Sequence, residues 1–157
     1  GEWIPNGLLY KFVKHGENGD IEPNEIFSKF TFEEKDTLGY QHFFGNYITS
    51  LYYDSFVYTG NLLSIKSRLG EAEPYYKKAI NISPNRNNAY INFATSQVAN
   101  GRCDQAEENI NKAGEINSSD VSFLRVLLSY EKICKKDEEA VRKVQELIDK
   151  KTPQNQF

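Results

Sequence analysis

Residues 69–84 read LGEAEPYYKKAINISP and carry the clearest helix signal in the chain. Ala72, Tyr76 and Ala79 recur at three- and four-residue steps, a spacing that places side chains on one face of an α-helix. Pro84 cannot continue such a helix because proline lacks the backbone N–H. The stretch therefore predicts a helix that carries small and aromatic residues on one face and stops before Pro84.

The same pattern recurs when the sequence is shifted against itself by 34 residues. Five columns align in one frame, and they hold either small or large apolar residues. The small residues allow the two helices of a hairpin to approach closely, and the large ones fill the space beside them. The columns are Gly60 and Ala94; Ala72, Ala106 and Ala140; Ala79, Ala113 and Leu147; Phe56, Tyr90 and Leu124; and Tyr76, Ile110 and Val144.

This frame predicts helices joined by short turns. We expect them at about 37–66, 69–82, 87–99, 103–116, 120–134 and 137–150. Asp104, Asp120 and Asp137 lie near three expected helix starts, where a carboxylate stabilises the helix end. The predicted fold class is therefore all-α, with about two and a half to three antiparallel helix-hairpin repeats and an extended N-terminal arm.

The first part of the chain differs in composition from the rest. Of the 21 aromatic residues, 14 lie between Trp3 and Tyr58, which suggests an aromatic-rich segment packed on the helices. Residues 8–13, LLYKFV, suit a short strand, and Asn18-Gly19 favours a tight turn. We therefore divide the chain into an extended arm (1–35), a helical repeat domain (36–152) and a tail (153–157).

The helix–turn–helix frame resembles the tetratricopeptide repeat (TPR) family. The family's small, aromatic, alanine and proline positions correspond here to Gly60, Tyr76, Ala72, Ala79 and Pro84. The resemblance places the units at about 53–86, 87–120 and 121–154. It implies a concave face, lined by the first helix of each unit, that holds a peptide or protein.

The groove residues that this resemblance implies lie on three of the expected helices. They are Asp54, Val57, Tyr58, Asn61, Asn88, Ile91, Asn92, Thr95, Ser122, Arg125 and Ser129. Some family members clamp a C-terminal carboxylate with Lys, Asn, Asn, Lys and Arg, and the matching positions here are Val57, Asn61, Asn92, Ser122 and Val126. Because the three basic residues are absent, the carboxylate would lack charge-assisted partners, which argues against a chaperone-tail adaptor. Two alternatives stay open: Asn61 and Asn92 bind a peptide backbone, or the face is solvated or covered by the arm.

Composition and motifs argue against several other functions. Asp and Glu number 22 against 19 Lys and Arg, so we expect no nucleic-acid binding. No apolar run of about 18 residues occurs, so we expect no insertion of this chain into a membrane. His15 and His42, the two histidines, belong to no catalytic or metal-binding motif, and no phosphate-binding glycine motif occurs. We therefore expect no catalytic residue, metal or cofactor here.

A second resemblance covers the N-terminal arm. Residues 3–12, WIPNGLLYKF, resemble a segment of bacterial multi-span, glycosyltransferase-like membrane proteins. In those proteins a Phe-x-Lys-Phe-x-(Phe/Trp) stretch and helical repeats follow, matched here by Phe27, Lys29, Phe30 and Phe32. The resemblance implies the soluble C-terminal part of a larger protein, at the extracytoplasmic face of a bacterial membrane, with a cytoplasmic location as the alternative. The start Gly1-Glu2-Trp3, which has no signal-peptide pattern, also leads us to expect a longer protein.

These observations favour a non-catalytic domain that binds a protein or peptide, acts as a scaffold, or packs on its own membrane module. The alternatives are an accessory domain that positions acceptor substrates for sugar transfer, and a structural cap with no ligand.

Cys103 and Cys134 lie symmetrically about the expected turn at Ser118-Ser119. Because the helices on either side of that turn run antiparallel, the two cysteines should lie at the same end of the pair. A disulfide is possible in an oxidising compartment. The alternative, which we favour on sequence alone, is two unpaired and partly buried thiols.

Two triplets, Asn81-Ile82-Ser83 and Asn117-Ser118-Ser119, fit the N-glycosylation sequon. Such triplets are common by chance, so the sequence alone gives them little weight.

Overall fold

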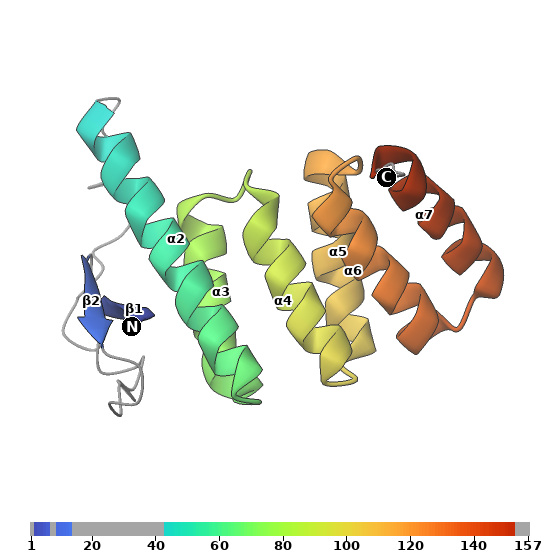
Figure 1. Cartoon of the computed structure of the whole chain (residues 1–157), viewed down its shortest axis with the longest axis horizontal. Helices are drawn as coiled ribbons and strands as arrows, with labels where there is room; N and C mark the ends of the chain where they lie inside the picture. The colour runs from blue at the N-terminus through green and yellow to red at the C-terminus, as the bar shows by residue number, and fades with distance from the viewer. Residues whose placement is uncertain (1, 7–8, 14–42, 153–157) are drawn as a thin grey trace, which may run out of the picture. The chain divides into compact units, whose positions relative to one another are not determined.

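Figure 1 shows the computed structural model of the chain. It describes residues 2–6, 9–13 and 43–152, with side chains from Thr49 on. The chain divides into two compact units, Gly1–Ser83 and Pro84–Phe157. From Phe43 onward every described element is a helix, which confirms the predicted all-α class. None of the described helices combines the length and the apolar character needed to cross a membrane.

Two strands near the N-terminus, β1 (Glu2–Asn6) and β2 (Leu9–Val13), pair as an antiparallel hairpin. The second strand confirms the predicted one. Its partner was not predicted. Pro5 of β1 lacks a backbone donor, which is tolerated here because a two-stranded sheet has only edge strands. The predicted turn at Asn18-Gly19 falls outside the described residues, as does the expected start of the first helix at residue 37.

Unit Gly1–Ser83 contains a hairpin of two helices, α2 (Phe43–Ile65) and α3 (Leu69–Ile82), which contact each other. Gly60 of α2 lies directly against the ring of Tyr76 of α3. A Cβ atom at Gly60 would come within 2.7 Å of that ring. The helices therefore approach closely where the sequence places its small residue. The core of the hairpin is made of Tyr53, Phe56, Leu63, Leu69, Ala72, Tyr75, Tyr76 and Ala79.

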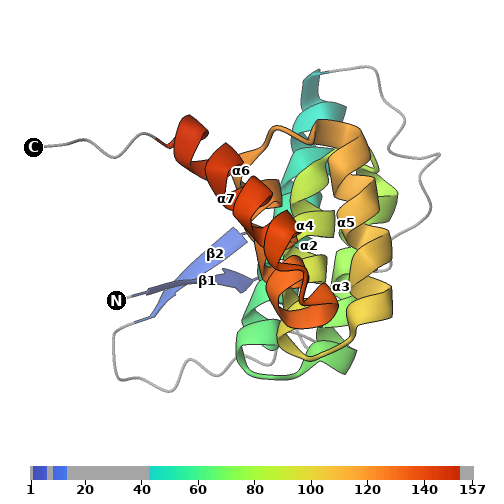
Figure 2. The same ribbon diagram turned by 90° about the vertical axis from the view of Figure 1, so that its right-hand side faces the viewer.

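Unit Pro84–Phe157 contains a further set of helices. They are α4 (Asn87–Ala99), α5 (Cys103–Asn117), α6 (Val121–Tyr130), the π-helical turn η1 (Glu131–Lys135) and α7 (Glu138–Lys151). α4 contacts α5 and α6, α5 contacts α6, and α7 contacts α6 and η1; Figure 2 shows these helices from the side. The bounds agree closely with prediction, with one correction. The single helix predicted over 120–134 is α-helical only as far as Tyr130 and then continues as η1, which ends at Lys136 with a φ of 56°.

The aspartates predicted at helix starts are found there. Asp120 is the N-cap of α6, and its carboxylate accepts a hydrogen bond from the backbone N–H of Ser122 over 2.7 Å. Asp137 caps α7 in the same way, with the N–H of Ala140 at 3.0 Å. Asp104 lies in the first turn of α5, where the helix dipole favours a negative charge.

Most members of the 34-residue columns are buried in this second unit. They are Tyr90, Ala94, Ala106, Ile110, Ala113, Leu124 and Val144. The exceptions lie on α7, where Ala140 is half-buried and Leu147 is 46% exposed. α7 is the last helix in the part of the chain that the structure describes, so within that part no following helix packs on it.

Cys103 and Cys134 form a disulfide, with Cα atoms 5.6 Å apart. Cys103 is the first residue of α5, and Cys134 lies in η1. The predicted placement at one end of an antiparallel pair is therefore correct, and the unpaired thiols that we favoured are wrong. The pair geometry could locate both sulfurs, but sequence alone does not fix their oxidation state.

Candidate ligand-binding face

Helices α4 and α6 begin side by side. Asn87, the first residue of α4, donates a hydrogen bond from Nδ2 to Oδ2 of Asp120, the N-cap of α6, over 2.9 Å. This hydrogen bond lowers the pKa of the Asp120 carboxyl below its ordinary value and outweighs the opposing effect of burial. Since both helices start at this bond and contact each other, they run in the same direction (Figure 1).

The bond also sets the register of the two helices. It joins residues 33 apart, so a position in α4 lies level with the position 33 residues later in α6. Asn92 and Arg125 follow Asn87 and Asp120 by the same number of residues. At about 1.5 Å of rise per residue, both lie roughly 7.5 Å along their helices. The two side chains that the sequence singled out therefore belong to the same level of neighbouring helices.

Six of the predicted groove residues lie on these helices and are exposed or half-buried. We call them the α4–α6 face: Asn88, Asn92, Thr95, Ser122, Arg125 and Ser129. Their steps of three, four and seven residues place them on one side of each helix. Ile91 was also predicted for the groove, but it is only 5% exposed, so its side chain belongs to the core.

Two hydroxyl groups of the face bond within their own helices. Thr95 donates from Oγ1 to the carbonyl oxygen of Ile91 over 2.8 Å, and Ser129 donates from Oγ to that of Arg125 over 3.0 Å. These donors are engaged, so a ligand would meet these hydroxyls mainly as acceptors.

Three other polar side chains of the face are not engaged in this way. Within the part of the chain that the structure describes, the side chains of Asn88, Asn92 and Arg125 have no hydrogen-bond or ion-pair partner. Asn92 is half-buried and Arg125 is exposed. The carboxamide of Asn92 and the guanidinium of Arg125 therefore lie at the same height along their helices. Together they offer both hydrogen-bond donors and an acceptor.

The groove residues predicted on α2 belong to the first unit and have other surroundings. Asp54 is exposed and accepts a hydrogen bond from Oγ of Ser50 over 3.4 Å, while Val57 and Tyr58 are half-buried. Asn61 accepts a hydrogen bond from Oη of Tyr76 over 2.9 Å. The side-chain oxygen of Asn61 thus holds α3 against α2, a structural role that the repeat frame could not reveal.

Burial and hydrogen bonding have opposite effects on the pKa of Tyr76. Its Oη also lies 3.0 Å from Oγ of Ser64, and Asn61 and Ser64 both belong to α2. Burial raises the pKa of Tyr76, and the hydrogen bond to Ser64 opposes that rise. The neutral phenol is therefore the stable form over the physiological range.

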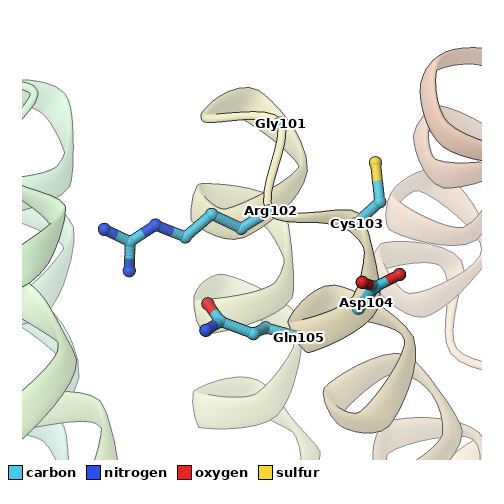
Figure 3. A pocket seen from close by; sticks show the side chains of 5 residues that line it. All are labelled: Gly101, Arg102, Cys103, Asp104 and Gln105. Carbon is cyan, nitrogen blue, oxygen red and sulfur yellow. The ribbon is translucent and has the colours of Figure 1, made fainter.

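A hollow of about 320 Å³ lies at the turn between α4 and α5 and is lined by Gly101, Arg102, Cys103, Asp104 and Gln105. Figure 3 shows that the side chains of Arg102 and Gln105 extend to one side while those of Cys103 and Asp104 turn to the other. The lining groups do not converge on one point, and none of the predicted groove residues takes part.

An ion pair that was not predicted from the sequence lies next to the disulfide. Lys135 Nζ lies 3.0 Å from Oε1 of Glu107 and 5.5 Å from the centre of the Tyr130 ring. The hydrogen bond from Lys135 lowers the pKa of Glu107, and the one to Glu107 raises that of Lys135. Glu107 lies one turn after Cys103 and Lys135 directly follows Cys134, so the ion pair and the disulfide join the same two segments.

Neither a protein-family model nor a curated protein matches this chain.

Proposed function

We propose that this chain is a TPR-like scaffold domain whose α4–α6 face binds an extended segment of a protein. One observation carries the proposal: Asn92 and Arg125 lie at the same height along two parallel helices. Neither side chain has a hydrogen-bond or ion-pair partner among the described residues. Polar side chains of this kind, presented by the first helices of successive hairpins, suit a ligand that lies across them.

The chemistry of the face indicates the kind of segment. The carboxamide of Asn92 can donate to a peptide carbonyl and accept from a peptide N–H, so it suits an extended backbone. The guanidinium of Arg125 suits an Asp or Glu side chain, because charge-assisted hydrogen bonds to carboxylates are strong. Ser122 and Val126 stand where a C-terminal carboxylate clamp would need basic residues. We therefore propose an internal acidic segment as the ligand.

We place the domain outside the cytoplasm, as the soluble C-terminal part of a larger membrane protein. The Cys103–Cys134 disulfide supports this location, since disulfides persist in oxidising compartments. The segment bound would then come from the protein's own membrane module or from a neighbouring protein. We propose no catalytic role for this chain.

A peptide selection tests the proposal. A random peptide library displayed on phage is selected on the whole oxidised chain, and affinities of the enriched peptides are measured by calorimetry. Arg125→Ala should weaken acidic peptides roughly 10- to 100-fold, the worth of a charge-assisted hydrogen bond, and Asn92→Ala roughly 5-fold.

Matched variants make the result specific. Asn111 and Arg142 are exposed residues on α5 and α7, away from the face, so Asn111→Ala and Arg142→Ala should leave the affinities unchanged. A selection that enriches no acidic peptide, or peptides equally sensitive to both pairs of variants, would count against the proposal and favour a structural cap.

A further inference from the structure

Asn117-Ser118-Ser119 lies at the turn between α5 and α6. Asn117 is the last residue of α5, and all three residues of the triplet are exposed. The side-chain oxygen Oδ1 of Asn117 accepts two hydrogen bonds from Ser119, one from the backbone N–H over 3.1 Å and one from Oγ over 2.9 Å. The asparagine and the hydroxyl two residues later are thus already in contact.

We propose that Asn117 is an acceptor for an N-linked glycan. The sequon requires a hydroxyl two residues after the asparagine. Here that hydroxyl donates to the carboxamide oxygen of Asn117. A hydrogen bond to this oxygen stabilises the negative charge that develops there as Nδ2 loses a proton to a base, which makes the nitrogen a better nucleophile. The turn holds the two groups in the arrangement that such activation needs.

The reaction needs two external components, an oligosaccharyltransferase and an oligosaccharide linked to a lipid diphosphate. Nδ2 of Asn117 attacks the anomeric carbon of the first sugar and forms the N–C bond. The bond between that carbon and the diphosphate oxygen breaks, and the lipid diphosphate leaves with the electron pair. The proton from Nδ2 passes to a base of the transferase. No oxidant or reductant is required.

The second sequon, Asn81-Ile82-Ser83, provides an internal comparison. Asn81 is also exposed, but it lies inside the last turn of α3. Ser83 is the C-cap of that helix, and its backbone N–H donates to the carbonyl oxygen of Ala79 over 3.0 Å. Among the described contacts, the side chains of Asn81 and Ser83 do not bond to each other. The helix must unwind before this triplet can adopt the arrangement found at Asn117.

The disulfide bears on where the reaction takes place. N-glycosylation occurs on proteins that enter an oxidising, secretory compartment, and Cys103–Cys134 is a disulfide of the kind that persists there. The disulfide, which is observed independently of the sequon, is therefore consistent with the compartment in which this modification occurs. This inference does not depend on the ligand of the α4–α6 face.

The test is secretion of the whole chain, behind a signal peptide, from yeast cells. Tryptic peptides are treated with peptide-N-glycosidase, which converts a glycosylated asparagine to aspartate, and analysed by mass spectrometry. Cleavage after Lys78, Arg86, Lys112 and Arg125 separates the two sequons into different peptides. We expect occupancy at Asn117 several-fold above that at Asn81.

Variants separate the acceptor from general folding effects. Asn117→Gln and Ser119→Ala should abolish the modification of the peptide that contains residue 117, Ser119→Thr should retain it, and Asn81→Gln should leave it unchanged. Formation of the Cys103–Cys134 disulfide, checked by mass, shows that each variant folds. Secreted, disulfide-bonded protein without a glycan at Asn117, or with no more there than at Asn81, would overturn the inference.

Discussion

Removing the Cys103–Cys134 disulfide should destabilise the second unit strongly. The bond joins the first turn of α5 to η1 and closes a loop that spans a sequence separation of 31 residues. Cleaving it enlarges the set of conformations open to the unfolded chain, whereas the folded contacts of α5 with α6 are retained. The perturbation is the double variant Cys103→Ser/Cys134→Ser, compared with the oxidised chain.

The expected size follows from the loop length. The chain-entropy relation gives about 3.7 kcal/mol at 25 °C for a loop of this separation. A chain of this size loses about 2–4 °C of melting temperature per kcal/mol, so the transition should fall by about 10 °C. The Lys135–Glu107 ion pair links the same segments, but both side chains are about half exposed, so it offsets only a small part of the loss.

The assay is thermal denaturation followed by circular dichroism. The oxidised chain is compared with the double variant and with the parent chain after reduction by a phosphine. The two perturbed samples should agree, because both lack the cross-link, and this agreement controls for the serine substitutions. Melting temperatures within 1–2 °C of the oxidised chain, with the disulfide verified by mass, would refute the loop argument. Two titratable thiols in the chain purified under oxidising conditions would refute the disulfide itself.

Three further predictions concern packing and charge. Gly60→Ala should cost about 1–3 kcal/mol of unfolding free energy in urea titrations, because the new methyl group would meet the Tyr76 ring at 2.7 Å; an unchanged midpoint would show that the ring can move away. Ala106→Trp should unfold the second unit, since Ala106 is fully buried, and a variant that melts like the parent would refute the 34-residue frame. The folded-state pKa of Asp120 lies below its ordinary value of 3.8, so the stability that this carboxylate contributes is complete above about pH 5 and is lost as pH falls through the folded pKa. The difference in unfolding free energy between the parent and Asp120→Asn should therefore shrink from pH 6 to pH 3, and a constant difference would contradict this assignment.

Local signals in the sequence were sufficient for the helices. Pro84, the aspartates at helix starts and the spacing of apolar residues fixed the bounds of α3, α4, α5 and α7 to within about one residue. These signals depend on residues a few positions apart in the chain, so the helix bounds can be predicted from the sequence. The change from α6 to η1 was not predictable, because no proline or glycine interrupts residues 131–135.

Features that depend on distant residues were predicted less well. The position of the disulfide followed from the antiparallel pair, but its oxidation did not. Asn61 matched a groove position, and yet its oxygen binds Tyr76 from the neighbouring helix. The ion pair of Glu107 with Lys135 joins residues far apart in sequence, and no local pattern near either residue predicts it. In each case the role of a side chain depends on a partner residue that comes close to it only in the folded chain.

Charge reversal at Arg125 tests the central proposal most directly. An acidic peptide selected on the parent chain is synthesised in two forms, one with its key Asp or Glu and one with Lys at that position. If Arg125 of the α4–α6 face pairs with that carboxylate, Arg125→Glu should lose the acidic form at least about 10-fold and gain affinity for the lysine form. Arg142→Glu on α7 should change neither affinity. Equal binding of both peptides by the parent and by Arg125→Glu would contradict the proposed face.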